Sequence, residues 1–431
     1  MRLRGKKEAI VLLIGDLLSF FLALWLALAL RSFSLPSWKL MSPHLEAFCW
    51  IFAIWIVVFY IANLYHHRTA TLFRNRLAVL ITNTQLINSL IALVFFYFVR
   101  SFGITPKTTL FINLILTLGL LLWWRLYLVV WLTPRRQEQI IFLSAGKEVE
   151  ELRQELENNS QYQITAPIQT VHSFKPSSAA TIAVNLYEEK RPEFLSFLSR
   201  LLFSGARVVG VQDLYEDVFD RVPLNLVEER WLLENVSNHP KSVYDLFKRL
   251  MDLVLSLVIF TISIPLYPFI WLAIKLDDRG PIFYTEPRVG RHGRFFMVPK
   301  FRSMSTEDDL SIRKVTRVGA FLRRSRFDEL PQLWSIVLGQ QSLIGPRPER
   351  PDYVKLYEQQ IPYYSARHLL KPGLSGWAQI HQTKHPHFQL QVDATREKLS
   401  YDLYYLKNRS IWLDISIALK TIKTILSRSG L

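Results

Sequence analysis

The chain has 431 residues, half of them hydrophobic, and a formal net charge of +16. This length is enough for more than one domain, and an apolar yet strongly basic chain is typical of membrane proteins with anionic partners. The single cysteine excludes intrachain disulfides and cysteine metal clusters.

Four apolar runs fill the first 135 residues, at about 9–30, 45–65, 77–99 and 109–132. Each is close to the roughly 20 residues that a helix needs to cross the hydrocarbon core of a membrane. Basic residues gather before the first run, between the second and third, and after the fourth. Because basic connections stay in the cytoplasm, we predict a four-helix transmembrane domain over residues 1–135, with its N-terminus and the following chain cytoplasmic.

Two charged residues fall inside these runs. Asp16 lies near the cytoplasmic end of the first run, where we expect a helix–helix contact rather than a functional site. Arg125 lies in the fourth run beside Trp123 and Trp124. If the hydrocarbon core ends near the two tryptophans, the long arginine side chain is expected to reach the interface.

Residues 137–237 alternate predicted strands, at about 139–143, 162–168, 181–186 and 206–211, with predicted helices. Such alternation indicates an α/β domain with a parallel sheet. The turn after the first strand is where a dinucleotide-binding fold keeps three glycines, and here only Gly146 remains. We therefore predict a Rossmann-like cytoplasmic domain without a cofactor and with a regulatory or dimerising role. A working dinucleotide site is the alternative.

Another apolar segment, at about residues 247–276, is interrupted by Pro265 and Pro268 and has basic residues at both ends. If this segment spans the membrane, everything after it lies on the far side. Proline removes a backbone hydrogen bond and clashes with the preceding turn, so a break would let the chain enter and leave on one face. The basic ends favour a re-entrant hairpin broken at Pro265, and a kinked span is the alternative.

Residues 323–333 combine three arginines with two adjacent carboxylates, Asp328 and Glu329, and a Pro-Arg-Pro sequence follows at 346–348. Ser325, three residues before Asp328, has the form of a helix start, which places both carboxylates at a helix N-terminus. Neighbouring side chains on a helix diverge by roughly 100°, so one carboxylate can attack phosphorus while the other holds a divalent metal. The alternative is a capped, solvated helix start without a chemical role.

From about residue 241 to its end, the chain resembles the bacterial sugar transferases, which are monotopic polyprenyl-phosphate hexose-1-phosphate transferases, or phosphoglycosyl transferases. The resemblance rests on five motifs in chain order: Lys300-Phe301-Arg302-Ser303-Met304, Asp328-Glu329-Leu330-Pro331-Gln332-Leu333, residues 342–348, residues 371–379 and Tyr401-Asp402-Leu403-Tyr404-Tyr405. With the four spans and the middle domain, the whole chain looks like the large form of that family. The implied fold is an α-helical membrane bundle, an α/β Rossmann-like domain, and a mixed, mainly helical catalytic domain over 241–431 with a re-entrant membrane helix.

The resemblance implies transfer of a sugar-1-phosphate from a UDP-sugar to undecaprenyl phosphate with release of UMP. Asp328 would form a covalent phosphosugar–aspartate intermediate, and Glu329 with Asp328 would hold Mg²⁺. Such chemistry is coherent, because a carboxylate can act as a covalent nucleophile and cation charge can supply much of the catalysis. The implied setting is the bacterial inner membrane, with cytoplasmic soluble domains, at the first membrane step of exopolysaccharide, capsule or O-antigen assembly.

Six cations are expected to contact phosphate groups: Lys300, Arg302, Arg323, Arg324, Arg347 and Arg367. The sequence leaves the transferred sugar open. Two other functions also stay open: a membrane glycosyltransferase that releases UDP, and an inactive membrane scaffold. A homodimer also stays open, although no motif supports one, and the predicted spans argue against a nucleic-acid partner.

Overall fold

A computed structural model describes residues 2–62, 64–65, 74–98, 107–129, 138–157, 162–165, 181–185, 192–236, 242–305, 314–382 and 391–427. The chain divides into two units, and each is described by itself. The first unit holds Met1–Leu143, Glu150–Ala183 and Phe197–Val208, and the second holds Ser144–Val149, Val184–Ser196 and Val209–Leu431. The domain boundaries expected from the sequence stay a prediction.

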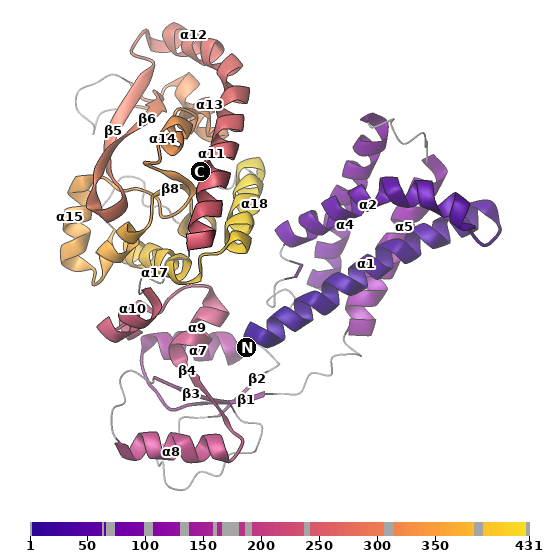
Figure 1. Ribbon diagram of the computed structural model, residues 1–431, viewed down its shortest axis with the longest axis horizontal. Coiled ribbons are helices and arrows are strands. Elements are labelled where there is room, and N and C mark those ends of the chain that lie inside the picture. Colours follow the sequence, from indigo (N-terminus) through magenta and orange to yellow (C-terminus); the bar gives the residue numbers. More distant parts are fainter. Residues whose placement is uncertain are drawn as a thin grey trace. The chain divides into compact units, whose positions relative to one another are not determined.

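Long helices form the N-terminal part of the first unit (Figure 1): α1 (Arg2–Ser32), α2 (Trp38–Ile61), α4 (Arg74–Phe98) and α5 (Lys107–Trp123). A π-helical turn, η1 (Trp124–Leu128), continues α5. Helices α1, α2 and α4 each contain a segment that is long and apolar enough to cross a membrane, and α5 together with η1 makes another. The buried faces are rich in aromatic rings, and Phe20 packs against Phe52, Trp55 and Phe59. The four apolar runs are thus confirmed as helices.

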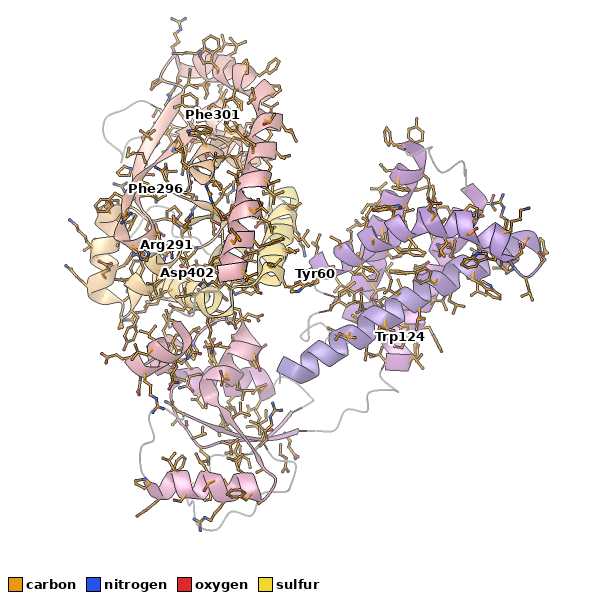
Figure 2. All side chains as sticks on the ribbon, in the orientation of Figure 1. Tyr60, Trp124, Arg291, Phe296, Phe301 and Asp402 are labelled. Carbon is orange, nitrogen blue, oxygen red and sulfur yellow. The ribbon has the colours of Figure 1, made fainter. Side chains whose placement is uncertain are left out.

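A buried ion pair ties α1 to the π-helical turn. Arg125 Nε donates to Asp16 Oδ1 at 3.0 Å, and Arg125 Nη1 donates to Leu64 O at 2.7 Å. Trp124, labelled in Figure 2, packs on Gly15, where a Cβ would lie 1.9 Å from the indole ring. The contact predicted for Asp16 is confirmed. The expectation that Arg125 reaches the interface is wrong, because its side chain is 4% exposed and paired inside the bundle.

Four strands form one sheet in the order β2-β1-β3-β4: β1 (Glu138–Phe142), β2 (Tyr162–Thr165), β3 (Thr181–Val184) and β4 (Arg207–Gly210). β1 pairs in parallel with β2 and with β3. Helices follow three of these strands in the chain: α7 (Lys147–Glu157), α8 (Pro192–Phe203) and α9 (Val211–Phe219). All four residues of β3 are buried, as is usual for a parallel strand covered on both faces. The predicted alternation of strands and helices is confirmed for these elements.

The second unit continues with a 3₁₀ turn and a mixed, mainly helical set of elements: η2 (Leu224–Leu226), α10 (Glu229–Val236), α11 (Ser242–Ser263), η3 (Ile264–Leu266), α12 (Tyr267–Asp278), β5 (Phe283–Val289), η4 (Arg291–Gly293), β6 (Phe295–Phe301), α13 (Arg317–Ser325), η5 (Phe327–Glu329), α14 (Gln332–Val337), β7 (Ser342–Ile344), α15 (Pro351–Gln360), η6 (Tyr364–Leu369), β8 (Gly373–Ser375), α16 (Trp377–His381), α17 (Val392–Asn408) and α18 (Ile411–Ser427). β5 and β6 form an antiparallel hairpin, and β7 pairs in parallel with β8. The mainly helical character predicted for the C-terminal part is therefore observed.

Helices α11 and α12 together make the fifth segment that is long and apolar enough to cross a membrane, Val243–Asp278. Pro265 lies in the 3₁₀ turn between them, and α12 turns away from the line of α11 at this point (Figure 1). Pro265 thus lies in the short turn where α11 ends and α12 begins. Many apolar side chains of both helices are exposed in this unit, among them Leu255 and Leu272.

The segment between the sheet and α11 packs on helix α17. Trp231 of α10 and Val222 lie in one buried cluster with Leu399 and Leu403 of α17. The main-chain N–H of Val222 also donates to Ser400 O at 3.1 Å. The last helices before the apolar segment are therefore part of the core of the second unit.

Replacing Trp231 with Ala is expected to destabilise the second unit by roughly 3 kcal/mol, because such buried aromatic truncations cost about 3–5 kcal/mol. The measurement is the thermal unfolding midpoint of the purified protein in detergent. Leu233, on the same helix but 72% exposed, is the matched control, and Leu233→Ala should leave the midpoint unchanged. Equal midpoints for the two variants would contradict this packing.

Candidate active site

Asp328 and Glu329 lie in the 3₁₀ turn η5, between α13 and the short helix α14. Helix α13 ends at Ser325, and Arg326 adopts a left-handed backbone conformation with φ 59°. The predicted helix start at Ser325 is wrong, because Ser325 Oγ donates back to Phe321 O at 2.9 Å inside α13. The two carboxylates are therefore positioned by a tight turn that follows a helix end.

Glu329 is the carboxylate whose charge is matched by cations. Its Oε1 lies 3.1 Å from Arg347 Nη2 and 3.5 Å from Arg326 Nη1. Burial opposes ionisation, but the charges of Arg347, Lys300 and Arg326 outweigh it and hold the pKa of Glu329 below its usual range. Glu329 is thus ionised at neutral pH and fixed in place.

Asp328 has a different environment, although it is equally buried. Within the described part of the chain, its Oδ1 has no hydrogen-bond partner. Burial and the neighbouring charge of Glu329 raise the pKa of Asp328 to about 6, against the opposing charges of Lys300, Arg326 and Arg323. A buried carboxylate oxygen without a partner is costly until a ligand satisfies it. Glu329 is therefore a fixed anion, whereas Asp328 has an oxygen without a partner among the described residues. This arrangement suits Asp328 as a nucleophile beside an ionised carboxylate.

The structure brings three of the predicted phosphate contacts to this pair. Lys300 is the next-to-last residue of β6, which packs against η5, and burial with the charge of Arg347 lowers the pKa of Lys300. Arg347 contacts Glu329 directly, and its side chain is one-third exposed, at 33%. Arg323 is close enough to lower the pKa of Asp328. Arg326 is the remaining cation beside the pair. It lies in the 323–333 stretch, but the sequence did not predict it to be a phosphate contact.

Two other predicted contacts do not face the carboxylates. Arg302 forms a two-pronged ion pair with Asp278, and its Nε donates to Pro281 O at 2.5 Å. Its side chain is 7% exposed and holds the end of α12 against β6. Arg324 is exposed on α13. A phosphate role for these two residues therefore has no support from their positions.

Arg367 is also enclosed, in a cluster of charges that the sequence did not single out. It pairs with Asp402 at 2.8 Å, and Asp402, labelled in Figure 2, is 1% exposed. Glu349 and Lys398 are in contact beside them. Asp402 belongs to the Tyr401–Tyr405 motif, so the sequence marks it as a residue of interest. The motif does not predict that its ion-pair partner is Arg367.

The donor set fits Mg²⁺ if the substrate contributes ligands. Among the described residues, no group of three His, Cys, Asp or Glu side chains gathers to hold a metal. Mg²⁺ is usually bound through one or two carboxylates together with substrate phosphates and water. The free Oδ1 of Asp328 and the neighbouring Glu329 carboxylate supply such a set.

Comparison with known proteins identifies the C-terminal part. Residues 243–428 match the model of the family described as bacterial sugar transferase. An Aeromonas hydrophila UDP-N-acetylgalactosamine-undecaprenyl-phosphate N-acetylgalactosaminephosphotransferase is 36% identical over 246 residues, which cover 55% of this chain and 56% of that protein.

Two further relatives match a similar region. An undecaprenyl-phosphate glucose phosphotransferase of Komagataeibacter xylinus is 39% identical over 45% of this chain and 39% of its own length. A Caulobacter vibrioides UDP-glucose:undecaprenyl-phosphate glucose-1-phosphate transferase is 34% identical over 44% of this chain and 73% of its own length. The match thus spans about half of the first relative, less of the second and most of the third.

The structural role of Arg302 is tested by replacing its partner. Asp278→Asn is expected to cost roughly 3 kcal/mol, because it leaves a largely buried guanidinium without its counter-charge. Asp352→Asn is the matched control, since the pair of Asp352 with Arg350 is on the surface and such pairs are worth about 0–1 kcal/mol. The readout is the unfolding midpoint in urea. An unchanged midpoint for Asp278→Asn would leave Arg302 free for the phosphate role.

Proposed function

The chain belongs to the bacterial sugar transferase family, and on this premise we propose that it transfers a sugar-1-phosphate from a UDP-sugar to undecaprenyl phosphate and releases UMP. The relatives described above are named as undecaprenyl-phosphate sugar transferases. The observation that carries the proposal is the unequal pair of carboxylates: one oxygen of Asp328 has no partner among the residues that the structure describes, and the neighbouring Glu329 is bound by cations.

The first step is an attack of the Asp328 carboxylate on the β-phosphorus of the UDP-sugar. The bond between this phosphorus and the oxygen that bridges to the α-phosphate breaks, and UMP leaves with the electron pair. The product is a phosphosugar–aspartate, a covalent intermediate of the kind that carboxylate nucleophiles form. In the second step an oxygen of undecaprenyl phosphate attacks the same phosphorus and frees Asp328.

The cations around the pair bind the phosphates and oppose their charge. Arg347 is partly exposed and can contact a phosphate oxygen while it holds Glu329. Lys300 and Arg323 add positive charge on the side of Asp328. Asp328 and Glu329 would hold Mg²⁺, which when bound supplies further charge neutralisation at the phosphates. Positioning and charge of this kind provide most of the rate enhancement in phosphoryl transfer.

We infer that α11 and α12 form a re-entrant membrane segment. A straight helix over the 36 residues Val243–Asp278 would be about 54 Å long and would place its ends on opposite sides of a core about 30 Å thick. Instead, both ends bond to one folded part. Arg249 donates to Ile336 O at 2.7 Å near the start, and Asp278 pairs with Arg302 at the end. Entry and exit on one membrane face, with the break at Pro265, accounts for both sets of contacts.

This arrangement brings the active site to the level of the lipid headgroups. Phe301 (Figure 2) and Leu322 pack with Ile270 and Ile274 of α12 in one buried cluster, so α12 is attached to the elements that flank the two carboxylates. The lipid phosphate acceptor lies at the same level. The proposed setting is the bacterial inner membrane, with the soluble parts in the cytoplasm, where UDP-sugars are found, at the first membrane step of polysaccharide assembly.

For the middle domain we propose a Rossmann-like fold that binds no dinucleotide. In the sheet order β2-β1-β3-β4, the direction in which successive strands are added changes between β1 and β3. In such folds a ligand binds at this point, at the carboxyl ends of the strands. Here protein groups occupy those ends: the Asn185 N–H donates to Ser144 Oγ at 2.6 Å, and Gln212 Nε2 donates to Asn185 Oδ1 at 2.6 Å. These contacts support a structural or regulatory role.

The nucleotide that is released tests the proposed reaction. The purified protein is incubated with Mg²⁺, undecaprenyl phosphate and, in turn, UDP-galactose, UDP-glucose and UDP-N-acetylgalactosamine; the last two carry the sugars in the names of the relatives described above. We expect UMP from at least one donor and a loss of about a thousandfold or more in Asp328→Asn, since the nucleophile is removed. Asp393→Asn, an exposed aspartate of the same unit, should keep full activity. Release of UDP would mean glycosyl transfer and would refute the proposal.

The pH dependence of kcat/KM tests whether Asp328 is the carboxylate that attacks phosphorus. Because Asp328 must be ionised to attack and its pKa is raised to about 6, kcat/KM for UMP release should rise as the pH increases through about 6. In Glu329→Gln the neighbouring negative charge is gone, so the pKa of Asp328 falls and the midpoint of this rise should move to lower pH, on a lower overall rate. A midpoint that stays in place, or moves to higher pH, would show that Asp328 is not the titrating group.

A further inference from the structure

We propose that Arg367, together with Asp402, Glu349 and Lys398, is a positioning group that acts on the reaction through Arg347 and does not touch substrate. The inference rests on the proposed function, because it concerns the same reaction. It assigns to Arg367 a different role from the phosphate contact expected from the sequence.

The loop that carries Arg347 is held by four consecutive main-chain carbonyls. Each accepts a hydrogen bond from another element: Pro346 O from Gly373 N at 2.9 Å, Arg347 O from Arg367 Nη2 at 2.8 Å, Pro348 O from Arg288 Nη1 at 3.2 Å, and Glu349 O from Val289 N at 2.9 Å. Proline on either side of Arg347 also restricts φ. The main chain of this loop therefore has little freedom, and the Arg347 side chain starts from a fixed point.

The loop is also tightly packed against residues 371–373. A Cβ on Gly345, the residue just before the loop, would lie 2.5 Å from Lys371 O. The backbones of the two segments therefore touch where β7 pairs with β8. This leaves the two arginine side chains, Arg367 and Arg288, as the parts of the support that can be changed without breaking the backbone.

Arg367 is enclosed by the groups it holds. Besides the bond to Arg347 O, its Nη1 donates to Tyr364 Oη at 2.8 Å, and Nη2 lies 2.8 Å from Asp402 Oδ2. The side chain is 2% exposed. A guanidinium with these partners cannot reach a phosphate beside Asp328 without leaving them.

The cluster holds as many basic as acidic side chains. Arg367 and Lys398 are the basic members, and Asp402 and Glu349 are the acidic ones. Lys398 Nζ contacts Glu349, and Arg367 Nη1 lies 4.0 Å from the same carboxylate. Burial opposes ionisation of Glu349, but Lys398 and Arg367 hold its pKa at about 2. Buried charged groups are tolerated when they are paired in this way, so the cluster can lie directly behind Arg347.

A chain of contacts thus leads from the cluster to the reacting pair. Asp402 orients Arg367, Arg367 holds the Arg347 carbonyl, and the Arg347 guanidinium holds Glu329. A shift of the loop would move the guanidinium away from both Glu329 and the phosphates. Such an effect slows the chemical step, whereas a lost direct contact to a bound phosphate also weakens substrate binding.

The test is a double-mutant cycle on the full-length protein. Arg367→Lys keeps the charge but loses the planar fork that donates to Arg347 O and Tyr364 Oη and pairs with Asp402. UMP release is measured for wild type, Arg367→Lys, Arg347→Ala and the double variant, with kcat and KM separated. Arg396→Lys is the matched control, because Arg396 also donates to a main-chain carbonyl, that of Gln360, away from the loop, and it should keep the wild-type kcat.

We expect Arg367→Lys to lower kcat about tenfold to a hundredfold, as supporting residues around reactive groups commonly do, with KM changed less than about threefold. The double variant should be no slower than Arg347→Ala, because Arg367 has nothing to position once the Arg347 side chain is absent. Effects that multiply, a rise in KM alone, or an unchanged kcat would overturn the proposal. If Arg367→Lys does not fold, Asp402→Asn replaces it in the cycle with the same expectations.

The proposed reaction and the positioning role of Arg367 can be refuted separately. Release of UDP instead of UMP by the wild type would refute the proposed function. Release of UMP by the wild type, with multiplying effects of the two arginine variants, would refute only the positioning role of Arg367.

Discussion

Two adjacent carboxylates cannot both be buried and charged unless cations are held beside them, and much of the second unit serves this requirement. Glu329 receives Arg347 and Arg326, so its charge is matched, while Asp328 keeps one oxygen free among the described residues. The cations come from separate elements: the end of β6, the residue after α13, and the loop at 346–348. The pair therefore has its unequal character only when all three elements are in place.

Each of these elements is in turn held in place by contacts to other parts of the second unit. The loop at 346–348 is fixed by carbonyl contacts and by a cluster of paired, buried charged side chains around Arg367. The strand β6 is joined to α12 through Arg302 and Asp278, and α12 belongs to the apolar segment proposed to enter the membrane. If α11 and α12 form a re-entrant segment, the ion pair of Arg302 with Asp278 both stabilises the fold and sets the level of the active site relative to the lipid.

Several features could be predicted because their causes are local. The long helices follow from runs of apolar residues, and the parallel strands from short apolar segments separated by helices. The carboxylate pair stood out because cations and a Pro-Arg-Pro sequence surround it in the chain. The helix start at Ser325 was wrong for a local reason too: Arg326 adopts a left-handed conformation that a sequence pattern does not reveal, and it ends α13 there.

The sequence by itself determined the long apolar helices, the parallel strands of the middle domain, and which two carboxylates are the candidates for chemistry. Only the tertiary structure decided which arginines serve them. Motif arginines are chemically alike, and their roles depend on partners that are distant in the chain: Arg302 takes Asp278, 24 residues away, and Arg125 takes Asp16, 109 residues away. A guanidinium bonds to whichever oxygen the fold places within reach, so Arg347 reaches Glu329, whereas Arg302 and Arg367 hold the structure around it.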